Sequence, residues 1–140
     1  MTNPADPAGR TVLVFSDDPT IRAQIRSAIG RRPAPDIGRI EYIECADQLA
    51  VVDELDLGEI DLVILDGEAQ PTGGMGICRQ LKNEIFPCPP ICIVIARRDD
   101  RWLARWSLSD ATLTYPIDPV DAAETVAGLL RAGTSVAAPR

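Results

Sequence analysis

The chain has 140 residues, which is enough for one domain with its own hydrophobic core and too few for a second, effector-type domain. With 21 acidic against 14 basic residues and a net charge of −7, its surface should repel nucleic acid and anionic membranes. No apolar run reaches the roughly 18–20 residues of a membrane span, and the first residues lack a signal peptide's apolar core. We therefore expect a cytoplasmic protein that does not bind nucleic acid or insert into a membrane.

Hydrophobic periodicity predicts strands and helices in alternation along the chain. Apolar runs and one alternating segment predict strands at residues 11–15, 40–45, 61–66, 91–96 and 112–115. Amphipathic stripes predict helices at residues 19–29, 47–55, 75–84, 100–108 and 120–131. Five such units favour an α/β fold, a five-stranded parallel sheet that is doubly wound, with helices on both faces. We expect this domain at residues 10–132, between a disordered leader (1–9) and a disordered tail (133–140).

Two features of the sequence that suggest a cofactor site have simpler explanations. The cysteines show no CxxC spacing and the chain has no His, so we predict buried, reduced thiols at Cys45, Cys78, Cys88 and Cys92. The loop "PTGGMG" lacks both the GxGxxG pattern and a P-loop Lys. Gly73 and Gly74 are therefore expected to serve the turn into the next helix.

Acidic residues follow the ends of two predicted strands. Asp17 and Asp18 come directly after the first strand, and Asp66 ends the third. In a doubly wound sheet these ends meet where the strand order reverses, which is where ligands bind. Clustered carboxylates of this kind suit Mg²⁺ and would repel the phosphate of a flavin nucleotide. The alternative is that they are solvated loop acids, with Asp18 capping the helix that Pro19 opens.

Several motifs together resemble the receiver domain of two-component response regulators, a CheY-like, flavodoxin-like fold. They are "VLVFSDDPTIR", "DLVILD" followed by "GICRQLK", "PPICIVIAR" and "LTYPIDP", and they cover nearly the whole chain. The resemblance implies that Asp66 accepts a phosphoryl group from a histidine kinase. It also implies that Asp17, Asp66 and the main-chain carbonyl of Glu68 hold Mg²⁺. Nearly all basic residues are Arg, which is typical of a GC-rich bacterial genome.

The sequence departs from the family at four positions of this site. Ser16 replaces one acid of the family's acidic pair, leaving Asp17 with Asp18 as its neighbour. The position of the phosphate-binding hydroxyl falls on Ile95 or Ala96, and the aromatic switch residue falls on Thr112. The conserved Lys of the family falls on Tyr115, which has no positive charge at neutral pH.

A cation near this edge could compensate for the missing Lys. Arg97 or Arg98, just past the fourth strand, could supply that charge, although solvated surface side chains are the simpler interpretation. The departures predict that any Mg²⁺ binding is weak.

Three functions remain open at this point. The first is an atypical, single-domain response regulator (a pseudo-receiver) that acts through protein contacts, with weak or absent phosphorylation of Asp66 and no enzymatic activity. The second is a working phospho-receiver in a phosphorelay. The third is a small Mg²⁺-dependent enzyme that handles phosphate, for which the sequence offers no recognisable general base or substrate pocket.

Two Trp residues mark a candidate contact surface for partners. Partners implied by the resemblance are a histidine kinase, a downstream target or a second copy of the chain, bound through the fourth helix, fifth strand and fifth helix. The sequence places Trp102 and Trp106 one turn apart in the fourth helix, beside Arg101 and Arg105, and Trp and Arg are enriched in binding hot spots. The alternative is that both indoles pack on the sheet together with Leu103.

Overall fold

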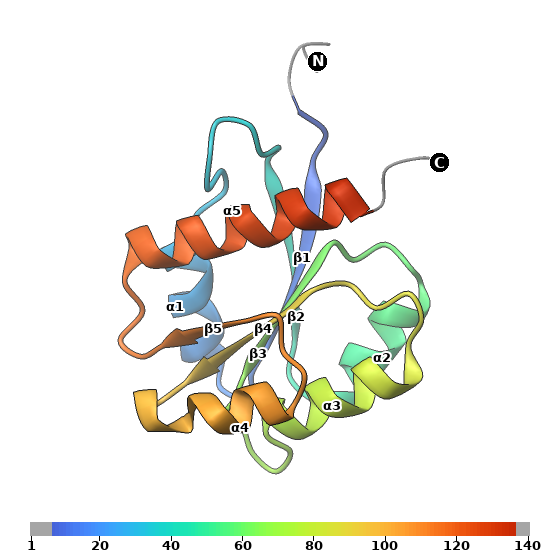
Figure 1. Cartoon of the computed structure of the whole chain (residues 1–140), viewed down its shortest axis with the longest axis vertical. Helices are drawn as coiled ribbons and strands as arrows, with labels where there is room; N and C mark the ends of the chain where they lie inside the picture. The colour runs from blue at the N-terminus through green and yellow to red at the C-terminus, as the bar shows by residue number, and fades with distance from the viewer. Residues whose placement is uncertain (1–6, 137–140) are drawn as a thin grey trace.

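The apolar runs of the sequence form one parallel sheet, which lies at the centre of the domain (Figure 1). The computed structural model describes residues 7–136. The strands are β1 (Arg10–Phe15), β2 (Ile40–Cys45), β3 (Leu62–Asp66), β4 (Ile91–Ile95) and β5 (Ala111–Thr114). Their order across the sheet is β2-β1-β3-β4-β5, so the strand order reverses between β1 and β3.

Helices cover both faces of the sheet, which confirms the predicted doubly wound α/β fold. One face carries α1 (Pro19–Ile29) and α5 (Pro119–Val136). The other carries α2 (Gln48–Asp56), α3 (Gly74–Glu84) and α4 (Arg101–Trp106), the last preceded by the 3-10 turn η1 (Arg98–Asp100). No helix of the described part of the chain is both long and apolar enough to cross a membrane.

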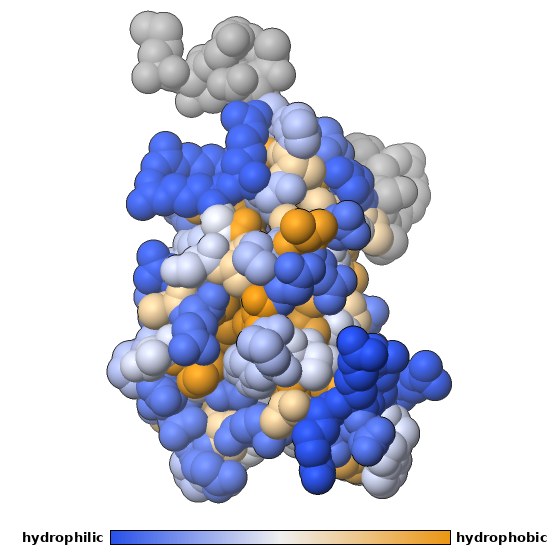
Figure 2. Space-filling model, turned by 90° about the vertical axis from the view of Figure 1, so that its left-hand side faces the viewer, coloured by the Kyte–Doolittle hydropathy of each residue, from blue (hydrophilic) through white to orange (hydrophobic). Residues whose placement is uncertain are grey.

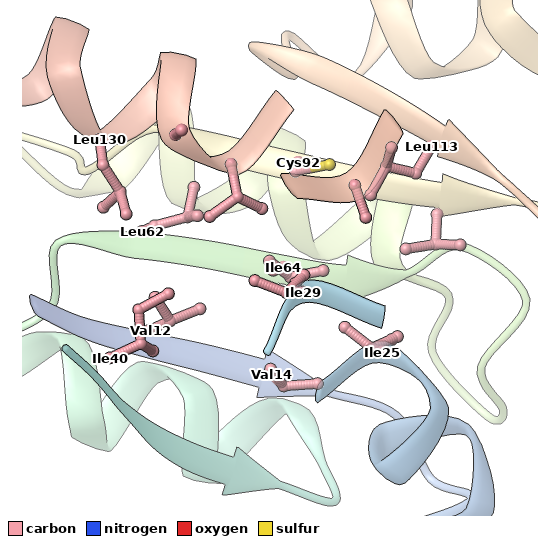
Figure 3. Close-up of a cluster of buried hydrophobic side chains, with 14 of the residues drawn as sticks. Val12, Val14, Ile25, Ile29, Ile40, Leu62, Ile64, Cys92, Leu113 and Leu130 are labelled. Carbon is pink, nitrogen blue, oxygen red and sulfur yellow. The ribbon is translucent and has the colours of Figure 1, made fainter. Parts of the chain in front are cut away.

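Alternation along the strands divides the core into two layers, one on each side of the sheet. Figure 3 shows the layer beneath α1 and α5, where Ile25, Ile29 and Leu130 point toward the strands. In β1, Val12 and Val14 belong to this layer, whereas Leu13 and Phe15 belong to the opposite one beneath α2, α3 and α4. Because both faces are covered, β3 and β4 are buried along their whole length, and this is why they appear as uninterrupted apolar runs in the sequence.

The ends of two helices differ from the prediction. α5 continues to Val136, past the predicted end at Arg131, so residues 133–136 belong to the helix and not to the predicted tail. A single Gly costs a helix only about 1 kcal/mol, which does not stop a helix that is already packed on the sheet. α4 ends earlier than predicted, because Leu108 adopts a left-handed backbone conformation (φ 72°). Of the predicted disordered leader (1–9) and tail (133–140), residues 1–6 and 137–140 lie outside the described residues.

Candidate functional site

The two central strands bring Ser16 and Asp66 together at the carboxyl edge of the sheet. β1 and β3 pair in parallel, with Phe15 opposite Leu65, and Asp66 follows in β3 while Ser16 follows in the chain after β1. The strand order reverses between these two strands. The site therefore lies where a doubly wound sheet binds its ligands, as the sequence predicted.

Asp66 is nearly inaccessible, and each of its carboxylate oxygens already has a hydrogen-bond donor. Its side chain is only 4% exposed. The Ser16 hydroxyl donates to Oδ2 over 2.8 Å, and the Glu68 main-chain N–H donates to Oδ1 over 2.9 Å. Ser16 is itself fully buried, and its hydroxyl oxygen accepts from the Asp18 N–H over 3.1 Å. These contacts satisfy a buried carboxylate that would otherwise be costly to desolvate.

The two acids after β1 stabilise local backbone structure instead of facing Asp66 as a pair. Asp18 is the N-cap of α1, and its carboxylate accepts from the Thr20 N–H over 2.8 Å. Asp17 accepts from the Gln70 N–H over 3.0 Å, which links the loop after β1 to the loop after β3. Both side chains are exposed. The structure thus shows for Asp18 the capping role that the sequence left as an alternative.

Gly74 is required at the start of α3 by its close approach to the end of β3. A Cβ atom at this position would lie 2.7 Å from the Asp66 carbonyl oxygen and 2.9 Å from Cβ of Leu65. Gly73 is the N-cap residue of the same helix. The two glycines therefore serve the turn into α3, as predicted, and allow the helix to pack directly beside Asp66.

Tyr115 follows β5 and directs its hydroxyl toward the acidic edge. The hydroxyl oxygen is buried and has no hydrogen-bond partner of good geometry among the described residues. Burial raises the pKa of the phenol, and the nearby negative charge of Asp66 raises it further. Tyr115 is therefore neutral at physiological pH and brings no positive charge to Asp66.

The expected positions of the phosphate-binding hydroxyl and of the aromatic switch residue are occupied by other kinds of side chain. β4 ends at Ile95, which is fully buried in the core, and Ala96 follows as an exposed residue. Neither has a hydroxyl group. Thr112 lies in β5 opposite Ile93 and is partly buried. It has no aromatic ring that could move between a buried and an exposed position.

Arg22 contacts this site and was missed by the sequence reasoning. Its guanidinium donates to the Ser16 carbonyl oxygen over 2.6 Å and pairs with Glu44 over 3.0 Å. These contacts place a positive charge next to the Ser16 main chain and hold that main chain in position. Arg97, proposed from the sequence as a compensating charge, is highly exposed and lies 3.6 Å from Asp100. Arg98 is also exposed, in η1.

The two carboxylates that the resemblance assigns to Mg²⁺ already accept hydrogen bonds from the chain itself. The ion prefers several oxygen ligands in near-octahedral geometry. Within residues 7–136, no group of three or more His, Cys, Asp or Glu side chains is placed to hold a metal. The Asp66 oxygens are engaged by Ser16 and Glu68, and Asp17 is engaged by Gln70.

The cysteines are free thiols, as predicted. Cys45, Cys78 and Cys92 are buried, and Cys88 is partly buried. Burial raises the pKa of each thiol, to about 11 for Cys45 and Cys78 and to about 12 for Cys92. All four are therefore protonated and weakly nucleophilic at neutral pH.

The fourth helix exposes both indoles instead of packing them on the sheet. Trp102 is 66% exposed and Trp106 is 53% exposed, and Ala104 makes the buried contact of the helix. The Arg79 guanidinium of α3 stacks over the Trp106 ring at 4.5 Å and donates to its main-chain carbonyl. Arg101 and Arg105 are exposed beside them. We call Arg101, Trp102, Arg105 and Trp106 the α4 surface.

Solved structures with the same fold are receiver domains. The Francisella response regulator 1452 receiver domain matches 88% of this chain and 98% of its own, with a TM-score of 0.73 and 19% identity. The chemotaxis response regulator CheY4 of Vibrio cholerae matches 87% of this chain and 99% of its own, with a TM-score of 0.70 and 15% identity. At these identities the likeness shows the fold alone.

Sequence relatives define the family. Uncharacterized response regulatory proteins from two strains of Mycobacterium tuberculosis are 48% identical over 121 residues, which is 86% of this chain and 91% of theirs. No family model matches the chain. The chain belongs to the response regulators, as a receiver domain of two-component signalling.

Replacing Ser16 with Ala should destabilise the protein by about 1–3 kcal/mol, because the buried Asp66 carboxylate loses a donor. Ser27→Ala, at an exposed position of α1, is the matched control and should change stability by less than about 0.5 kcal/mol. Urea unfolding at neutral pH measures both free energies. Equal stability of the two variants would show that the Ser16 bond does not support Asp66.

Proposed function

We propose that this protein is a pseudo-receiver, a single-domain response regulator that signals through protein contacts with weak or no phosphorylation of Asp66. The observation that carries the proposal is the engagement of both Asp66 oxygens by Ser16 and Glu68 in a site only 4% exposed. A phosphoryl donor would have to displace the Ser16 hydroxyl or approach around it. The same bonds hold the carboxylate in one orientation without any ligand.

The charges around Asp66 also disfavour phosphoryl transfer. Such transfer needs positive charge or hydrogen-bond donors where negative charge builds up on the phosphoryl oxygens. Tyr115 contributes a neutral phenol at the position that the resemblance assigns to Lys, and Ile95 and Ala96 contribute no hydroxyl. Asp18 and Glu68 lie near Tyr115 and add negative charge, and the Arg22 guanidinium is engaged by the Ser16 carbonyl and by Glu44.

The other two candidate functions receive less support. A working phospho-receiver keeps one argument, the position of Asp66 at the carboxyl end of β3 beside the point of strand reversal. An enzyme would need a substrate pocket beside Asp17 and Asp66. A shallow pocket lies instead between α1 and β2, lined by Arg26, Gly30 and Tyr42 and not by Asp17 or Asp66.

Signalling without phosphorylation requires a contact surface that is permanently available, and we propose the α4 surface for that role. Its two indoles are more than half exposed in the unmodified protein. Exposed Trp and Arg side chains side by side are the composition of a binding hot spot. The adjoining β5 and α5 complete the face that the family resemblance implies.

Incubation with acetyl phosphate and Mg²⁺ should modify only a minor fraction of molecules, as measured by intact-protein mass spectrometry. Tyr115→Lys should raise the rate at least about tenfold, because the cation offsets the incoming negative charge. Tyr115→Phe is the control without charge and should not raise it, and Asp66→Asn should abolish modification. Rapid, near-complete modification of the unaltered protein at Asp66 would establish the phospho-receiver instead.

Mg²⁺ should bind weakly, and Ser16→Asp should raise its affinity about tenfold or more by restoring a second carboxylate. Ser16→Asn tests the change of shape without the charge. Amide chemical shifts at the carboxyl edge report binding in an Mg²⁺ titration. Affinity that is unchanged by Asp66→Asn would contradict a role for Asp66 in this site.

Trp102→Ala and Trp106→Ala should each cost less than about 1 kcal/mol of stability, because the indoles are largely exposed, yet should abolish capture of the partner from host lysate. Phe86→Ala is a matched control, since Phe86 is 79% exposed in the loop after α3. Thermal unfolding and affinity capture measure the two effects. A large loss of stability with capture intact would instead assign the indoles to the core.

A further inference from the structure

The charge of the protein is strongly segregated along the chain. Between Arg39 and Arg79 there are ten acidic residues and no basic one. Residues 97–105 instead contain four Arg against two Asp. A surface of positive charge therefore stands out on a protein whose net charge is −7.

The acidic segment presents two exposed leucines, one in α2 and one at its C-cap. Leu49 and Leu57 are each 70% exposed, and Asp53 and Asp56 are exposed between them. The spacing of these four residues places them on one side of the helix, opposite the buried Val51 and Leu55. We call Leu49, Asp53, Asp56 and Leu57 the α2 surface.

The charged side chains of both surfaces are unpaired in the described part of the chain. Within residues 7–136, no ion pair or side-chain hydrogen bond joins Asp53, Asp56, Arg101 or Arg105 to another residue. Each surface also exposes a pair of large apolar side chains. In Figure 2, the most hydrophilic residues of the visible face gather in its lower part, at the level where α4 lies in Figure 1.

The two surfaces lie at opposite ends of one helical layer. α2, α3 and α4 cover the same face of the sheet, with α2 against β2 at one edge and α4 against β4 toward the other (Figure 1). α3 separates α2 from α4. The surfaces therefore cannot meet within one molecule, but they are placed to meet between two.

We propose that the α4 surface of one molecule binds the α2 surface of a second copy of this chain. Arg101 and Arg105 would face Asp53 and Asp56, and the indoles would pack against Leu49 and Leu57. The two surfaces carry opposite charges, and each exposes two large apolar side chains. This selects a second copy over nucleic acid, since nucleic acid would use only the cations. The inference rests on the proposed contact role of the α4 surface and is independent of the state of Asp66.

The contact joins two different surfaces, and this determines the kind of assembly. A head-to-tail contact leaves one α2 and one α4 surface free at the ends, so it forms chains whose length grows with concentration. Exposed charge pairs are screened by salt, so association should weaken when the ionic strength rises from about 0.05 M to about 0.5 M.

Charge reversal followed by mixing tests the proposal. Sedimentation velocity should show concentration-dependent association of the unaltered protein, weakened at least about tenfold in Arg101→Glu/Arg105→Glu and in Asp53→Arg/Asp56→Arg. An equimolar mixture of the two double variants should associate again, because each then offers the charge that the other needs. Arg31→Glu/Arg39→Glu and Glu41→Arg/Glu124→Arg, at exposed positions elsewhere, make the same changes of net charge and should leave association intact.

Three results would overturn the proposal. They are a monomeric protein up to millimolar concentration, association that survives both reversals, and a mixture of reversed variants that stays monomeric while the unaltered protein associates. Tighter binding of an oligonucleotide than of a second copy would reassign the cations to nucleic acid. The acetyl phosphate result on Asp66 and the capture of another protein through Trp102 are measured separately, so a failure here is distinguishable from a failure of the proposed function.

Discussion

The hydrogen bond from the Ser16 hydroxyl to Asp66 joins the ends of the two central strands, and the rest of the carboxyl edge is arranged around it. The Ser16 hydroxyl oxygen in turn accepts a hydrogen bond from the Asp18 main-chain N–H. The Arg22 guanidinium donates a hydrogen bond to the Ser16 carbonyl oxygen. Gly74 lets α3 approach the Asp66 backbone from the other side. The Asp66 carboxylate is thus stabilised by neutral donors of the chain itself.

A hydroxyl beside Asp66 has a different effect on this edge from a second carboxylate. A cluster of carboxylates is unfavourable until a cation relieves the repulsion, so its geometry depends on ligand binding. Exchanging one carboxylate for the Ser16 hydroxyl replaces a repulsion with an attraction to Asp66. This arrangement agrees with the proposed pseudo-receiver, which would present the same surface to its partners at all times.

The fold could be predicted from the sequence because strands buried on both faces appear as continuous apolar runs. One such run, "DLVILD", correctly predicted β3 and placed Asp66 at its carboxyl end. The site was less predictable. In the sequence, Ser16 could be described only as the replacement of a carboxylate. Its hydrogen bond to Asp66 could not be predicted, since a sequence does not show which group a hydroxyl will contact. Arg22 was missed because its partner is a main-chain carbonyl, which no residue pattern encodes. The exposure of Trp102 and Trp106 depended on the little room that a six-residue helix offers, and periodicity alone favoured the core.

The position of the indoles has a consequence for optical spectroscopy. Trp102 and Trp106 are the only tryptophans of the chain, and both lie on the six-residue α4, largely in water. Intrinsic fluorescence therefore reports on one short helix and not on the packing of the sheet. Its emission in the folded state should already resemble that of a solvated indole, so unfolding of the core should produce little spectral shift. The stacked Arg79 makes Trp106 the indole whose emission should respond more when α3 and α4 separate.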